Sequence, residues 1–180
     1  MNTMRSLVAF IASVTAVRAL SLNITAVGAT NNVSTLECWQ MDTPFSSATI
    51  PGITGSATAV IGTAANISYT VLPAAFDGGL HNAPFNQWVA FISGLAYVTL
   101  PTDDTAGAYI IGGEFGLVFA ADTAEVSGQG HRTQYPGTTE TVALAIPTTD
   151  GLIPGHTILH DGACTANDIE GLRGLAFGLS

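Results

Sequence analysis

The sequence predicts an all-β protein with a single domain. Short runs of alternating or apolar residues recur along the chain and are separated by turn-forming segments, with 20 glycines in total. No segment before residue 165 shows the 3.6-residue periodicity of an amphipathic helix. The one helix candidate covers 167–175, and Gly171 and Gly174 argue against a long helix there. Short, regularly spaced strands of this kind are typical of a β-sandwich or barrel.

In the first half of the chain we expect short strands separated by loops. Residues 20–36 are rich in Asn and Thr and are interpreted as a polar lead-in or an edge strand. Asp-Gly-Gly at 77–79 has the composition of a turn. The other expected elements, in order, are a short strand over 37–41, a loop over 44–55, and strands over 59–61 and 67–72.

The second half contains the longest strand-like run, residues 87–100. Gly94 in its middle predicts a bend or a tight turn between two strands. A polar hairpin loop is expected over 101–107, followed by strands over 108–111, 116–120 and 140–146. We find no linker and no repeat of solenoid length, so residues 20–180 are expected to form one domain.

Composition excludes several classes of partner. The 180 residues are 47% hydrophobic and only 9% charged, which argues against a disordered chain. Lysine is absent, and four arginines face 13 acidic residues. A chain this acidic lacks the basic surface that binds nucleic acid or an anionic membrane.

The first 19 residues have the pattern of a secretory signal. Arg5 supplies the positive start, residues 7–16 form an apolar run, and Val17 and Ala19 are small residues before the expected cleavage site. The apolar run is too short to span a bilayer. Cleavage would leave a secreted chain that begins at Leu20, with two arginines against 13 acidic residues and a net charge of −11.

Secretion gives meaning to two further features. Asn23, Asn32 and Asn66 begin Asn-x-Ser/Thr sequons and are predicted glycosylation sites. Cys38 and Cys164 are the only cysteines and are predicted to form one disulfide in an oxidising compartment. Two buried free thiols are the alternative, because a sequence alone does not fix a pairing.

His81, Gln87 and His131 are the candidate functional residues. Neutral imidazole is the commonest side-chain metal ligand, and an amide oxygen can complete such a site. Along a strand, Gln87 shares one face with Val89 and Phe91, so it is expected to point inward above an apolar floor.

The spacing of these residues resembles the two motifs of the cupin superfamily. The segment His81-x-Ala83-x3-Gln87-x6-Gly94 matches the spacing of the first motif, G-x5-H-x-H-x3-4-E-x6-G. The segment Gly128-x2-His131 matches the core of the second motif, G-x5-P-x-G-x2-H-x3-N. Small cupins with His-x-Ala-Pro-x-x-Gln and Asp-Thr…Gly-x-Gly-His-x-Thr segments are similar to residues 81–87 and 122–133. The resemblance covers about residues 65–147.

The chain also departs from the cupin motifs. Ala83 replaces the second histidine, Gln87 replaces the glutamate, and Ala75 replaces the first glycine. In the second motif, Val126 replaces the proline and Tyr135 the final asparagine. The resemblance implies a jelly-roll β-barrel with inward-pointing ligands, whereas the departures remove the carboxylate that would offset the charge of a metal ion.

The resemblance implies roles for particular residues. His81, Gln87 and His131 would hold one divalent ion (Fe, Mn, Ni, Cu or Zn), with Asp122 as an outer counter-charge. His81 and His131 would serve as catalytic groups, and without a metal one of them would act as general base. The alternative is a hydrogen-bonded polar cluster without a metal. The residues expected to contact substrate are Trp88, Phe91, Arg132 and Tyr135.

The function expected from these features is that of a secreted cupin that binds a small organic molecule in its barrel. The activity would be that of an isomerase, cyclase or oxygenase of specialised metabolism. The alternatives are a non-catalytic module that binds a small molecule or a sugar, and a secreted fungal effector or cell-wall protein. No nucleic-acid partner and no membrane span are expected. The oligomeric state is left open, with a homodimer as one option.

Overall fold

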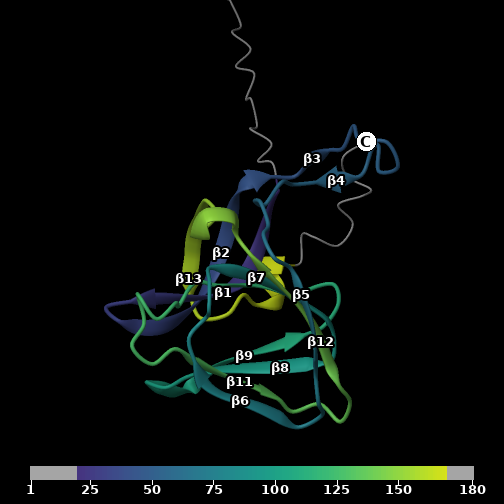
Figure 1. Ribbon diagram of the computed structural model, residues 1–180. Coiled ribbons are helices and arrows are strands. Elements are labelled where there is room, and N and C mark those ends of the chain that lie inside the picture. Colours follow the sequence, from purple (N-terminus) through teal and green to yellow (C-terminus); the bar gives the residue numbers. More distant parts are fainter. Residues whose placement is uncertain (1–19, 170–180) are drawn as a thin grey trace, which may run out of the picture.

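The computed structural model describes residues 20–169, apart from the side chains of 104–106 and 150. Within this part the protein is mostly β-structure, which confirms the predicted all-β class (Figure 1). One α-helical turn, α1 (Ala166–Ile169), occurs at its end, and the described residues contain no helix long and apolar enough to cross a bilayer. The expected signal segment, 1–19, and the rest of the helix candidate lie outside the described residues.

The strands form two main sheets and a small ribbon, with no closed barrel among the described residues. The seven strands of the large sheet are, in spatial order, β13 (His156–Asp161), β2 (Val33–Pro44), β1 (Ser21–Thr30), β10 (Leu117–Ala120), β7 (Gln87–Ser93), β12 (Thr141–Pro147) and β5 (Ser68–Leu72). The small sheet comprises β6 (Phe76–His81), β11 (His131–Tyr135), β8 (Leu95–Leu100) and β9 (Asp103–Ile111). The ribbon pairs β3 (Ser46–Ser47) with β4 (Ala57–Thr58).

Eight consecutive strands, β5 to β12, pair as a nested hairpin. β8 pairs with β9 at its tip, and the antiparallel pairs β7–β10, β6–β11 and β5–β12 follow outward. Two further pairings, β12 with β7 and β11 with β8, complete a four-stranded layer on each side. The long hairpin is thereby wound into two layers that face each other (Figure 1).

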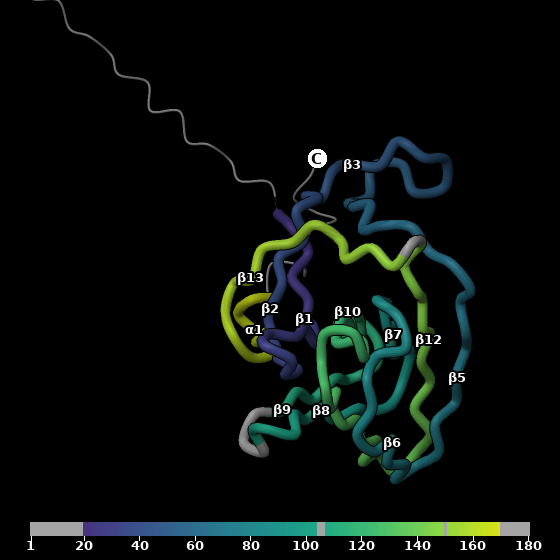
Figure 2. Tube along the Cα trace, turned by 60° about the vertical axis from the view of Figure 1, so that its left-hand side comes forward, coloured from purple at the N-terminus to yellow at the C-terminus, as the bar shows by residue number. Residues whose placement is uncertain are grey.

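The remaining strands extend the large sheet at one side. β1 and β2 form an antiparallel hairpin, β1 pairs in parallel with β10, and β13 adds to the far edge of β2 (Figure 2). The expectation of a lead-in or edge strand over 20–36 was therefore wrong. Ile24 and Ala26 are buried on the outer face of β1 and Val27 on the inner face, so the strand is covered on both sides.

Two apolar clusters occupy the two faces of the large sheet. The inner cluster lies between the sheets and includes Phe91, Val98 and Ile110. The outer cluster includes Trp39 and Trp88, with Ile61 and Ile146 packed against it. The inner cluster forms the floor of the site described below.

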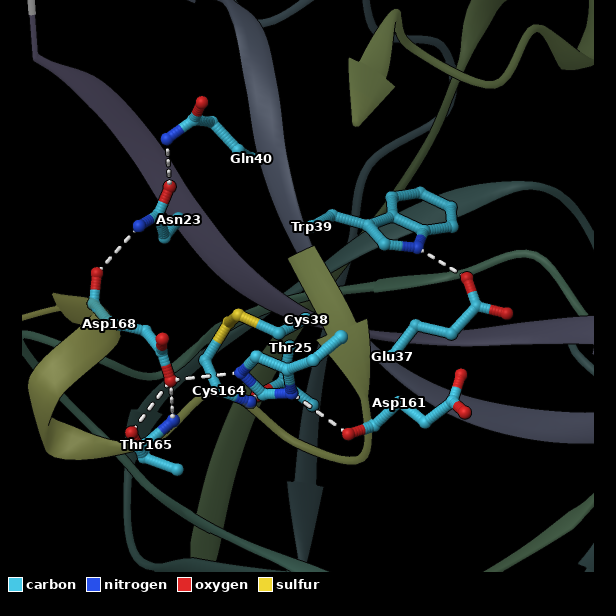
Figure 3. The surroundings of a disulfide bond; sticks show 11 residues. Asn23, Thr25, Glu37, Cys38, Trp39, Gln40, Asp161, Cys164, Thr165 and Asp168 are labelled. Atoms are coloured by element: carbon cyan, nitrogen blue, oxygen red, sulfur yellow. Dashed lines mark hydrogen bonds and ion pairs between the residues drawn. A yellow bond between two sulfur atoms is a disulfide. The ribbon is translucent and has the colours of Figure 1, made fainter. Parts of the chain in front are cut away.

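The predicted disulfide is present. Cys38 of β2 is bonded to Cys164, which lies between β13 and α1 (Figure 3). Thr25 of β1 accepts a hydrogen bond from the Cys164 backbone N–H through its hydroxyl, at 3.0 Å. The disulfide and this hydrogen bond therefore hold the C-terminal segment against the N-terminal hairpin.

Candidate functional site

The structure brings His81, Gln87 and His131 to one cavity of about 180 Å³ between the two sheets. His81 ends β6 and His131 begins β11, directly opposite each other in the antiparallel pairing. Side chains paired in this way project from the same face, and the two ring centroids are 4.7 Å apart. Gln87 begins β7 in the facing sheet. The expected convergence of the three side chains is thus observed, across 50 residues of sequence.

Gly130 allows the two histidine-bearing strands to approach each other. Its φ of +72° lies in the left-handed region, and a Cβ at this position would overlap the His81 carbonyl oxygen. Only glycine meets both conditions without strain. The Gly-x-Gly-His segment therefore places the His131 ring beside that of His81.

The cavity is apolar with a few polar groups near one another. His131 and Gln87 are only 6% and 8% exposed, and Thr133 is also buried, whereas His81 is exposed. Among the described residues, none that lines the cavity is Asp, Glu, Lys or Arg. The volume is below the roughly 300–1,000 Å³ of sites for drug-sized ligands, so the cavity suits a smaller molecule. The apolar lining comes from Val27, Leu72, Val89, Phe91, Val98, Val118 and neighbouring alanines.

His131 is held by a buried carboxylate. Its Nδ1 lies 2.7 Å from Oδ2 of Asp122, which is fully buried. An ionised carboxylate only accepts hydrogen bonds, so His131 donates from Nδ1 and its neutral form keeps an unprotonated Nε2. The expected role of Asp122 as a carboxylate behind the histidine agrees with this contact.

His81 has the same arrangement of donor and acceptor. Its Nδ1 lies 2.9 Å from the backbone carbonyl oxygen of Gly79, which can only accept. The neutral His81 ring therefore also keeps an unprotonated Nε2. Both imidazoles of the cavity are thus set as bases or as metal ligands through the same atom.

Phe91 and Tyr135 line the cavity, as expected of substrate-contacting residues. Burial raises the pKa of the Tyr135 phenol, so this side chain remains a neutral hydrogen-bond donor across the physiological range. The two side chains supply an aromatic wall and a hydroxyl.

Trp88, which was expected to contact substrate, does not line this cavity. Successive residues of a strand face opposite sides, and the inward position of Gln87 turns Trp88 outward. Trp88 packs edge-to-face against Phe119 in the outer cluster, with ring centroids 4.9 Å apart. Its role is to bury the outer face of β7.

Arg132, which was also expected to contact substrate, does not line the cavity for the same reason. His131 points into the cavity, so Arg132 points to solvent, where its guanidinium donates to both carboxylate oxygens of Asp77. This pairing, helped by the Gly79 backbone N–H, lowers the pKa of Asp77 to about 2. Arg132 therefore anchors β11 to β6 on the surface and does not line the cavity.

The donor set fits a divalent metal ion of the kind that accepts imidazole. His81 and His131 each keep Nε2 unprotonated, and no described group forms a hydrogen bond with the Gln87 side-chain amide. Asp122 behind His131 reproduces the carboxylate–histidine arrangement that orients metal ligands. Two imidazoles and an amide suit Zn, Cu, Ni or Fe better than the oxygen-preferring Mg or Ca.

A second group of potential ligands lies near the disulfide. Atoms of Cys38, His160 and Asp168 lie within 4.8 Å of one another, but the Cys38 sulfur is bonded to Cys164 and offers no thiolate (Figure 3). His160 instead contacts Asp168 at 3.2 Å. His156, four residues before it, stacks on Trp39 with ring centroids 3.6 Å apart. These histidines therefore have structural partners.

Sequence reasoning missed one layer of the site. Ser34 and Ser127 are buried near Asp122; Ser34 donates a hydrogen bond to Asp122, and Ser127 forms a hydrogen bond with Ser34. Ser34 lies on β2, 88 residues before Asp122, within a segment expected to be peripheral. Its only sequence signal was membership of a glycosylation sequon.

Comparisons with family models, curated proteins and solved structures found no match to this chain. Function is therefore inferred from the cavity and its side chains.

Proposed function

We propose that this chain is a secreted protein with a cupin-type jelly-roll fold whose cavity binds a small uncharged organic molecule and transfers a proton within it. The reaction class is an isomerisation or cyclisation. The observation that carries the proposal is the buried Asp122–His131 pair, which leaves an unprotonated imidazole nitrogen on a residue that lines an apolar cavity.

The strand pairing supports the jelly-roll part of the proposal. A jelly roll is a long antiparallel hairpin of eight strands wound into two sheets. The nested pairs β5–β12, β6–β11, β7–β10 and β8–β9 have that connectivity. Gln87 begins β7 and His131 begins β11, so each cupin-like segment leads into a strand beside the cavity.

The lining of the cavity defines the class of ligand. The described lining residues include no Arg or Lys to offset the charge of a carboxylate or phosphate and no Asp or Glu to offset that of an amine, and the neutral forms of His81 and His131 offset neither. A small neutral molecule with one or two polar groups avoids this cost. Gln87 and the Tyr135 hydroxyl can donate hydrogen bonds to a carbonyl oxygen of such a molecule.

The proton transfer needs no further reactant. The His131 Nε2 accepts a proton from a carbon beside the carbonyl group, and the electron pair of the broken C–H bond moves to give an enolate. Asp122 stabilises the imidazolium ion thus formed, as a buried carboxylate does in other histidine-based sites. The imidazolium then returns the proton to a different atom of the same molecule. General-base catalysis of this kind contributes about 10²- to 10⁴-fold in rate.

The test combines binding with proton exchange. Small cyclic ketones and phenols would be compared with their carboxylate and ammonium analogues by ligand-observed NMR. We expect only the neutral compounds to bind, and bound cyclohexanone derivatives to exchange their α-protons with D2O. His131→Gln should abolish the exchange and retain binding. Binding of the charged analogues, or equal exchange by the variant, would contradict the proposal.

The second candidate is a metal-dependent enzyme at the same site. It is favoured by the unprotonated Nε2 that each of His81 and His131 keeps. When bound, a divalent ion would supply Lewis acidity at a carbonyl oxygen or an enolate. Metal analysis of protein purified without chelators distinguishes the candidates. One equivalent of bound metal in the wild-type protein that is absent from His81→Ala would support the metal enzyme. A protein that binds neutral ligands without exchange or metal would be a binding module.

A further inference from the structure

The N-terminal hairpin contributes a residue to the site although it lies outside the eight nested strands. The Ser34 Oγ of β2 lies 2.7 Å from Oδ2 of Asp122, the same oxygen that accepts from His131 Nδ1. Ser34 is only 2% exposed. A hydroxyl from a strand two positions beyond the nested set therefore contacts the carboxylate that supports His131.

The hydrogen bonds around Asp122 have a fixed direction. The ionised carboxylate only accepts, so Ser34 uses its one hydroxyl proton to donate to Oδ2. Ser127, 2.7 Å from Ser34, must then donate to the Ser34 oxygen, while the Gly130 backbone N–H donates to Ser127 at 3.0 Å. Every donor in this chain is thus directed towards Asp122.

Only one oxygen of Asp122 is engaged. Oδ1 has no hydrogen-bond partner among the described residues, so Oδ2 receives both donors. The backbone at Asp122 is held separately, since the Asn82 side-chain amide donates to the carbonyl oxygens of Asp122 and Ser127. Among the residues that the structure describes, Ser34 is consequently the one side chain, besides His131 itself, that selects which carboxylate oxygen faces the imidazole.

We propose that Ser34 is a positioning residue for His131. By holding Oδ2 of Asp122, it keeps the carboxylate in the rotamer that accepts from Nδ1 and so keeps the unprotonated nitrogen at Nε2. The inference rests on the proposed function, in which that nitrogen is the base. It assigns the β1–β2 hairpin to the support of the site as well as to the sheet.

The primary readout is the tautomer of His131, which needs no substrate. Long-range 1H–15N correlation spectra distinguish Nδ1–H from Nε2–H imidazole through the nitrogen chemical shifts. We expect the Nδ1–H form in the wild-type protein and a mixture of both forms in Ser34→Ala. Ser34→Thr should restore the wild-type spectrum, because it retains the hydroxyl.

Two control variants isolate the effect of the hydroxyl. Ser34 is also the third residue of the Asn32 sequon, so all proteins would be made in a host that does not attach N-glycans, and Asn32→Asp would remove the sequon alone. Thr35→Ala deletes a neighbouring hydroxyl that is bonded to a different carboxylate, Glu37, at 2.6 Å. Both controls should keep the wild-type His131 tautomer.

The catalytic readout follows the same variants. Proton exchange should fall about 10- to 100-fold in Ser34→Ala, the range seen when a residue that orients a histidine is removed, with unchanged ligand affinity. Ser127→Ala leaves the Ser34–Asp122 bond intact and should have a smaller effect, which provides a second variant if Ser34→Ala does not fold. A wild-type tautomer in folded Ser34→Ala, or a shift of similar size in Thr35→Ala, would overturn the inference. If the wild-type protein shows no exchange, the proposed function fails, while the tautomer spectra still decide the role of Ser34.

Discussion

Gln87 is the residue at which the metal-bound and metal-free interpretations separate most clearly. Its amide is buried in an apolar cavity beside two imidazoles. With a divalent ion, Gln87→Glu adds the missing negative charge and should raise the melting temperature. Without an ion, the new carboxyl is desolvated, its pKa rises, and the protein should lose about 1–3 kcal/mol at pH 7.

Thermal melts of Gln87→Glu with Zn²⁺ and with EDTA measure this difference in sign. A carboxyl whose pKa is higher in the folded state destabilises above that pKa, so the metal-free loss should diminish as the pH falls towards 4. Gln87→Met, which has a similar volume and no charge, is the matched control and should respond to neither metal nor pH. Identical melts of Gln87→Glu under all conditions would argue against both interpretations.

Asp77 and Arg132 provide a test of the corrected role of Arg132. The guanidinium lowers the pKa of Asp77 to about 2, below its usual 3.8. A lowered carboxyl pKa contributes stability that is present above 3.8 and is lost as the pH falls towards 2. Arg132→Ala should therefore return the Asp77 titration towards 3.8, as followed by carboxyl NMR. Ligand binding should be unchanged, and a weakened affinity would show that Arg132 reaches the cavity.

The sequence could identify the residues of the site but not all of their neighbours. The motif spacing placed His81, Gln87 and His131 together. The two-residue period of the strand, which turns Gln87 inward, also turns Trp88 away from the cavity. Arg132 lies outside the cavity for the same reason, because it follows an inward histidine. Ser34 could not be found, since its partner Asp122 is distant in sequence and only the sheet order brings β2 close.

At the level of elements, the strands with alternating polar and apolar residues in the sequence were predictable, whereas β1 was not. Residues 67–72 and 140–146 correspond closely to β5 and β12, and Gly94, with φ +85°, separates β7 from β8 as predicted. β1 was expected to be a lead-in or an edge strand, because burial on both faces leaves no alternating pattern in its sequence. The Asp-Gly-Gly expected as a turn lies inside β6, where the pairing with β11 shifts register and Gly79 has φ +66°.

The disulfide between β2 and the C-terminal segment is expected to contribute strongly to stability. Cys38 and Cys164 are 126 residues apart, and closing a loop of this length stabilises a fold by about 5 kcal/mol through the unfolded state. We expect the double variant Cys38→Ala/Cys164→Ala to lose stability of this order in urea unfolding. Reduction of the wild-type protein should give a similar loss. No change in the unfolding midpoint would show that the bond does not constrain the unfolded chain.

At the scale of the whole molecule, the sequence predicted the class but not the extent of the large sheet. Composition and turn spacing were sufficient for an all-β protein. The nested pairing from β5 to β12 depends on contacts between distant strands, and no local pattern encodes it. The addition of β1, β2 and β13 was equally hidden, although it supplies the disulfide and Ser34.

The three sequons occupy different environments in the folded molecule. Asn32 and Asn66 are exposed and lie at positive φ. The Asn23 amide instead donates to the Asp168 carbonyl oxygen at 2.6 Å and accepts from Gln40 at 3.2 Å (Figure 3). A glycan on this half-buried nitrogen would disturb the contact between β1 and α1.

We therefore expect protein secreted from a eukaryotic host to begin at Leu20 and to carry glycans at Asn32 and Asn66 but not at Asn23. Glycosidase treatment in H2¹⁸O followed by peptide mapping measures occupancy at each site, because a released glycan leaves a labelled aspartate. Asn23→Gln should secrete with an unchanged glycan mass, whereas Asn66→Gln should lose one glycan. Full occupancy of Asn23 in folded protein would contradict the arrangement of β1 against α1, and an intact Met1 would contradict the signal segment.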